Sequence, residues 1–301
     1  MRQKTAMTKL ILAMCIFGTI GIFRRMLPYP SGMIACARAV IGAAFLFLLL
    51  VMRRHSMDQK MLKKYLVPLL ASGICLGGNW GLLFEAYRHA TVAVATVCYY
   101  MAPVFAMLAA AIFFRERLTG KKIFCILLAC GGMLLVSGIL DTQIKGVAGI
   151  LFGLGAAVLY AAVMLLGRFL TEIDSYDRTI VQLLVSVVAV GIYSLVMEEP
   201  TKITFCLRSH AIILLLIIGV LHTGIAYALY FDSIGKLPTQ TVAIFSFLDP
   251  VVSIILSVFF LQEPLTLRCI CGMCMILGSA VFNEVTFGRK VCKSESIREK
   301  S

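Results

Sequence analysis

Charged residues are scarce in this chain: only 14% of its 301 residues are Asp, Glu, Lys or Arg. Soluble domains usually carry about 25%. Hydrophobic residues make up 60%, which excludes a soluble domain, because such a fold buries only one face of each helix. It also excludes a disordered chain, which needs low hydrophobicity. The composition therefore indicates an integral membrane protein.

Enzyme motifs are also missing. The chain has no HExxH, GxSxG or P-loop pattern, so we expect neither an enzyme nor a pump driven by nucleotide hydrolysis. Asp249 has no second aspartate with which to form an intramembrane protease site. Most of the 11 cysteines lie inside apolar runs, where they act as small hydrophobes, so we predict no metal and no cofactor. The net charge of +13 comes without a basic stripe interleaved with aromatics, so no nucleic-acid partner is expected.

Long apolar runs are abundant instead. A helix crosses the hydrocarbon core of a bilayer in about 20 apolar residues. Ten runs have suitable length and composition: 7–23, 30–52, 65–85, 91–114, 121–140, 147–168, 179–197, 211–231, 239–261 and 266–283. The expected fold is therefore an all-α integral membrane protein with ten transmembrane helices. The first run also suits a signal-peptide core, but no small-residue cleavage site follows it.

The basic residues predict the orientation, because Lys and Arg concentrate in cytoplasmic loops. With the N-terminus in the cytoplasm, the inside segments carry 20 basic residues and the outside segments carry 7. We therefore expect a multi-pass protein of the plasma membrane with both termini cytoplasmic. Residues 285–301 then form a cytoplasmic basic tail.

The two halves of the chain resemble each other when one is shifted by 147 residues. Pro103 then falls on Pro250, Glu116 falls on Glu263, and each Glu begins a Glu-x-Leu-Thr sequence. Each half has five predicted spans, an odd number, so the second half must be inverted in the membrane. Inverted repeats are typical of secondary transporters, in which two similar halves exchange conformations. The predicted repeats are residues 1–142 and 146–284.

These paired motifs identify the sequence as similar to the EamA type of the drug/metabolite transporter superfamily. The resemblance rests on the stretches 84–119 and 231–266 and covers roughly 7–284. Arg38 matches an arginine that the family often carries in its second helix. The resemblance implies transport of a small molecule, commonly export of amino acids, metabolites or drugs. It implies no nucleotide hydrolysis.

Two prolines mark expected helix interruptions. Pro103 and Pro250 fall in the middle of the fourth and ninth runs, where each removes one helical hydrogen bond. A backbone group freed in this way needs a partner inside the protein or in a wet cavity. Matching interruptions in the two halves point to a substrate site or to hinges, although passive kinks remain an alternative.

Three ionisable residues fall near the middle of predicted spans: Arg38, His222 and Asp249. A charge at that depth costs about 2.5–3.5 kcal/mol, so these side chains should face the interior. Arg38 would bind an anionic group of the substrate, and Asp249 would bind a cationic group or a coupling proton. A structural Arg38–Asp249 pair and a packing role for His222 are the alternatives.

Other polar and aromatic residues are candidates for the cavity wall or for helix ends. Trp80, Tyr99 and Tyr100 are the aromatic candidates for substrate contact, because a binding cavity combines apolar walls with a few placed polar groups. Glu85, Glu116 and Glu263 lie at ends of predicted spans, as gates, caps or end pairs.

The function expected from these features is secondary transport by alternating access of a small metabolite, amino-acid-like solute or drug. Export and proton coupling are part of this expectation, and the partners are the lipid bilayer, a small-molecule substrate and protons. Two alternatives stay open. A small-solute channel would give faster flux without counterflow, and a scaffold or sensor would not change solute levels.

Overall fold

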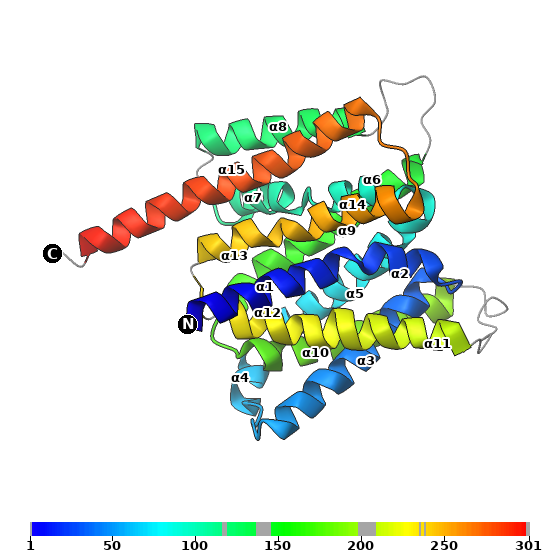
Figure 1. Cartoon of the computed structure of the whole chain (residues 1–301). Helices are drawn as coiled ribbons and strands as arrows, with labels where there is room; N and C mark the ends of the chain where they lie inside the picture. The colour runs from blue at the N-terminus through cyan, green and yellow to red at the C-terminus, as the bar shows by residue number, and fades with distance from the viewer. Residues whose placement is uncertain are drawn as a thin grey trace.

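The computed structural model describes residues 2–115, 119–136, 146–197, 209–234, 236–237 and 239–298, and every regular element in them is a helix. The all-α prediction is therefore confirmed for the described part of the chain. Most helices run roughly along one direction, and α1 begins at the same side of the molecule at which α15 ends (Figure 1).

The helices of the first half are α1 (Arg2–Gly18), α2 (Ile20–Met26), α3 (Ser31–Met52), α4 (Gln59–Lys64), α5 (Leu66–His89), α6 (Val92–Tyr99), α7 (Ala102–Phe113) and α8 (Gly120–Val136). Those of the second half are α9 (Val147–Gly167), η1 (Arg168–Leu170), α10 (Ser175–Met197), α11 (Ser209–Leu216), η3 (Ile217–Ile225), α12 (Ala226–Ile234), α13 (Thr239–Ser246), α14 (Leu248–Leu261) and α15 (Leu267–Arg298). Each predicted apolar run falls on one or more of these helices.

Seven helical stretches of the described chain are long and apolar enough to cross a membrane. They are Gln3–Met26, Ser31–Met52, Leu66–His89, Val92–Phe113, Val147–Leu170, Ser175–Ser194 and His210–Ser233. Two shorter apolar helices cover Leu248–Leu261 and Leu267–Phe282. The predicted run 121–140 corresponds to α8, which is described as far as Val136. The fold is thus that of a multi-pass membrane protein.

Several of the helical spans, each called a rod below, are interrupted rather than continuous. The first is divided at Thr19 between α1 and α2, and the fourth is divided between α6 and α7 at Tyr100 and Met101. A third break, at Phe247, separates α13 from α14. In the stretch His210–Ser233, the nine residues of η3 form a π-helix, a rare and wider helix that often occurs at functional sites.

The core lies around α5, which packs against α3, α9 and α10. Its buried members include Phe84 and Trp80 of α5 and Leu46 of α3, with exposed fractions of at most 4%. Helices α8 and α15 pack against each other beside this group (Figure 1). Because apolar residues also cover much of the outer surface, for example Phe113 and Phe259, the exterior suits lipid rather than water.

Candidate functional site

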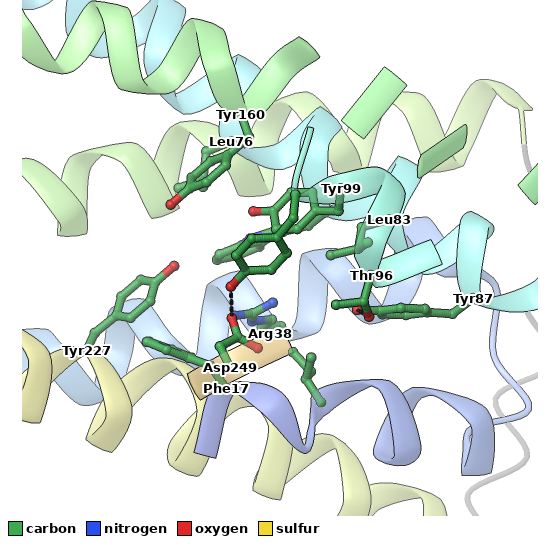
Figure 2. Close-up of a pocket in the computed structure, with 13 residues that line it drawn as sticks. Phe17, Arg38, Leu76, Leu83, Tyr87, Thr96, Tyr99, Tyr160, Tyr227 and Asp249 are labelled. Carbon is green, nitrogen blue, oxygen red and sulfur yellow. Dashed lines mark hydrogen bonds between the residues drawn. The ribbon is translucent and has the colours of Figure 1, made fainter. Parts of the chain in front are cut away.

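A branched cavity occupies the space between the two halves of the chain. One branch, the Arg38 chamber, has a volume of about 130 Å³. Its lining includes Arg38 and Asp249, labelled in Figure 2, and also Trp80. A wider branch, the Arg178 chamber, has a volume of about 520 Å³ and extends along α9, α10 and α12 to Gly167 and Arg178. Asp249 lines both chambers, so the two form one continuous site.

The cavity is built where two helix breaks meet. Tyr100 lies in the break between α6 and α7, and its hydroxyl donates a 2.9 Å hydrogen bond to Oδ2 of Asp249. This bond is the dashed line at Asp249 in Figure 2, and Asp249 follows the break at Phe247. Tyr100 and Phe247 are equivalent under the 147-residue shift, and their ring centres lie 6.2 Å apart. The two interruptions therefore face each other across the cavity.

The two prolines predicted to interrupt helices lie in the first turns of new helices. Pro103 is the second residue of α7 and lines a further branch of the cavity, and Pro250 is the third residue of α14. Proline is tolerated there because the first N–H groups of a helix have no intrahelical partner. Each interrupted rod is therefore two short helices and not one kinked helix.

Arg38 lies in the middle of α3 and is only 5% exposed. Its Nε donates a 2.8 Å hydrogen bond to Oγ1 of Thr223, and its Cζ lies 3.9 Å from the centre of the Trp80 ring. Among the ion pairs of the described residues, none joins Arg38 to Asp249. The terminal nitrogens of Arg38 also make no hydrogen bond to any described residue, so they remain available to a ligand in the chamber.

The other predicted contact residues separate into two groups. Trp80, Tyr99 and Tyr100 line the Arg38 chamber with Tyr160, whose ring stacks on Tyr99 at a centre distance of 5.2 Å. His222 is fully buried outside the lining of these chambers. It shares a 2.8 Å hydrogen bond with Thr19 at the break between α1 and α2.

The predicted helix-end glutamates differ in their surroundings. Glu85 pairs with Arg88 at 2.9 Å within its own helix. Glu263, whose side chain is 9% exposed, pairs with Arg25 at 3.1 Å and accepts a 2.8 Å hydrogen bond from the backbone N–H of Val92. Glu263 thus joins α2 and the start of α6 to the end of α14. Glu116 lies outside the described residues.

A charged cluster at the opposite end of the bundle was not predicted from the sequence. Asp232 accepts hydrogen bonds from Arg53 at 3.1 Å, from Tyr176 at 2.8 Å and from Lys9 at 3.3 Å. The hydrogen bond to Asp232 raises the pKa of Arg53 above its ordinary value. The signal available in the sequence was Asp232 itself, an acidic residue at the end of an apolar run.

Polar residues that partner the predicted site were also missed. Thr223 is hydrogen-bonded to Arg38, and Thr19 is hydrogen-bonded to His222. Thr96 shares a 3.1 Å hydrogen bond with Ser253 beside the Arg38 chamber. Single hydroxyl groups within apolar runs are common in membrane helices, because they can bond to their own backbone. Their position in the sequence alone gave no signal of these partners.

A cavity between helix breaks, in a membrane protein whose described elements are all helices, is the arrangement expected of a membrane transporter. Two matches to the family described as "EamA-like transporter family" cover residues 4–138 and 147–284. The chain therefore belongs to the EamA-like transporter family, which confirms the predicted resemblance. Membership makes it a membrane-embedded transporter with a small-molecule substrate.

Similar proteins agree with this assignment. "Uncharacterized transporter YxxF" of Bacillus subtilis (strain 168) is 31% identical over 86% of this chain and 83% of its own length. "Uncharacterized transporter YvbV" of the same organism is 24% identical over 83% of this chain and 81% of its own length. A solved structure described as "Crystal structure of protein" covers 96% of this chain and 99% of its own chain, with a TM-score of 0.63 and 18% identity. That likeness supports the fold.

Proposed function

We propose that this protein is a secondary transporter that moves a small polar or amphipathic solute by alternating access. Its ten spans would form two inverted five-helix repeats, residues 1–142 and 146–284, followed by the basic tail 285–301. The 147-residue repeat and the facing breaks at Tyr100 and Phe247 support this arrangement. Discontinuous helices at the repeat interface are typical of secondary transporter sites.

The proposed location is the plasma membrane, with both termini in the cytoplasm and net export of the solute. The excess of basic residues in the proposed inside segments supports the orientation. In this orientation the Arg178 chamber faces the cytoplasm, because its lining reaches Gly167 at the end of α9 and Arg178 near the start of α10. The described conformation then corresponds to the inward-open state.

Arg38 and Asp249 would bind the solute between them. A guanidinium offers planar donors that match a carboxylate, and Asp249 would accept a cationic group or a coupling proton. The observation that carries the proposal is that both side chains line one buried chamber without pairing with each other. Trp80, Tyr99 and Tyr100 would supply the aromatic wall, and the breaks near Pro103 and Pro250 would serve as hinges.

The test compares metabolites inside and outside cells that express wild type, Asp249→Asn or Glu172→Gln at matched membrane levels. Glu172 is an exposed acidic residue paired with Lys64, so its variant controls for the loss of one carboxylate. We expect one solute class to accumulate outside only with wild type and the control. Equal accumulation with Asp249→Asn would contradict the role of Asp249, and no accumulation with any protein would contradict export.

A further inference from the structure

The π-helix η3 brings two adjacent polar residues, His222 and Thr223, against the first half of the chain. Both are fully buried. The hydroxyl of Thr223 donates to the carbonyl of Ile218, five residues earlier, at 3.4 Å, and its oxygen accepts the 2.8 Å hydrogen bond from Nε of Arg38. Because the hydroxyl proton points to its own helix, the oxygen lone pairs are directed at the guanidinium.

The approach of η3 to α3 depends on a residue without a side chain. Gly42 lies one helical turn after Arg38, and a Cβ atom there would collide with Cβ and Cγ2 of Thr223. The close packing of these two helices therefore sets Thr223 at a fixed distance from Arg38. This contact joins residues 185 positions apart in the sequence.

We propose that Thr223 is a positioning residue that fixes how Arg38 presents its donors to an anion. A guanidinium can grip a carboxylate side-on, through Nε and one terminal nitrogen, or end-on, through both terminal nitrogens. Thr223 occupies Nε, and Trp80 covers one face of the group. Only the end-on arrangement is left, so the site takes a carboxylate that approaches along the axis of the Arg38 side chain.

The inference rests on the proposed function in taking the Arg38 chamber as the substrate site. Its geometry is measurable without transport, because Trp80 is the only tryptophan of the chain. The fluorescence of the purified full-length protein in nanodiscs therefore reports on the ring beneath Arg38. Quenching by iodide, an anion, measures whether the cation still covers the ring, and quenching by acrylamide measures access alone. Benzoate serves as the carboxylate probe.

The decisive variants are Thr223→Val, which keeps the shape but removes the acceptor, and Thr223→Ser, which retains it. Ser233→Ala is the matched control, because the hydroxyl of buried Ser233 donates to the carbonyl of Leu229 in the same rod. We expect Thr223→Val to change the Trp80 emission, reduce iodide quenching relative to acrylamide quenching and weaken benzoate binding about tenfold. Thr223→Ser and Ser233→Ala should match wild type.

The outcomes separate this inference from the proposed function. Unchanged quenching and benzoate affinity in Thr223→Val would overturn the positioning role, as would an equal loss in Thr223→Ser. If wild type does not bind benzoate but quenching still depends on the Thr223 acceptor, the positioning of Arg38 stands and the proposed anion site is wrong. If Thr223→Val does not fold, Thr223→Ala carries the same comparison against Ser233→Ala.

Discussion

The two ends of the cavity are built differently. Beyond the Arg38 chamber, Glu263 joins α2, α6 and α14 through Arg25, the N–H of Val92 and Ser257, whose hydroxyl donates at 2.7 Å. Towards the other end the Arg178 chamber widens to about 520 Å³. The charged cluster around Asp232 at that end lies outside the chamber lining and joins α1, α3, α10 and α12.

This difference indicates that the proposed transporter would close its cavity at the Glu263 end. At the Glu263 end, one nearly buried carboxylate bonds to groups 171 and 238 positions away in the sequence, so a contact between the two halves holds the helices together there. Helix packing reinforces it, because a Cβ atom on Gly21 of α2 would lie 2.5 Å from Cγ1 of Val92. In the proposed alternating access, this contact would close the outer end while the Arg178 chamber faces the cytoplasm, whereas a channel would need both ends open at once.

Of the substitutions that test this difference between the two ends, Glu263→Gln should have the largest effect. It weakens the charged hydrogen bonds to Arg25 and Val92, which together should favour the sealed state by about 2 kcal/mol. We expect a membrane-impermeant maleimide applied outside to modify Ile20→Cys faster when Glu263→Gln is present, in a chain without native cysteines. Ile20 lines the Arg38 chamber and is 9% exposed, so it reports on access through this end.

Glu85→Gln is the matched control for that measurement. Among the described residues Glu85 pairs within the last turns of α5, with Arg88 at 2.9 Å and His89 at 3.4 Å, so its loss should not change access to Ile20. Equal acceleration by both variants would mean that the charge at this end matters and the contact between helices does not. Such a result would remove Glu263 as the seal.

A smaller effect is expected from Asp232→Asn at the other end. The change weakens hydrogen bonds from Arg53, Tyr176 and Lys9, which are partly exposed, so we expect a loss of about 1–2 kcal/mol in the free energy of unfolding. Thermal unfolding in detergent should detect it as a lower midpoint. Access to Ile20→Cys from outside should not change, and an increase there would show that the two ends are coupled through this cluster.

The smallest effect is expected from the exposed pair of Glu172 and Lys64. Hydrogen bonds from Tyr65 and Lys64 hold the pKa of Glu172 below its ordinary value. Its contribution is therefore present above the ordinary pKa and lost as the pH falls through the lowered, folded-state value. Because both side chains are more than half exposed, Glu172→Gln should leave the unfolding midpoint unchanged at neutral pH. A clear drop would show that the 168–178 segment matters for stability more than its exposure indicates.

Much of the fold was predictable because it depends on properties that repeat along the chain. The apolar runs follow from composition, and Pro103 and Pro250 marked two breaks because proline is disfavoured inside a helix but tolerated in the first turn of a new one. The break at Thr19 was not predicted, since neither Thr19 nor its neighbour Gly18 forces a helix to end. The π-helix at 217–225 was also missed, because its residues have the same apolar pattern as an ordinary span.

The charged residues of the candidate site were predictable from the sequence, but their hydrogen-bond partners were not. Arg38 and Asp249 were noticeable because ionised groups are rare and costly within apolar runs. Whether they pair with each other could not be derived, because that depends on the positions of α3 and α14. His222 shares the same sequence signal as Arg38, yet it packs against Thr19 away from the chamber lining.

The sequence by itself determined that the chain is a membrane protein of helical spans with two similar halves, because composition and repetition are properties of the chain alone. Only the tertiary structure decided which hydroxyl meets Arg38, which N–H meets Glu263 and towards which end the cavity widens. These contacts join residues more than 150 positions apart. They depend on how closely whole helices pack, which no pattern within a single helix specifies.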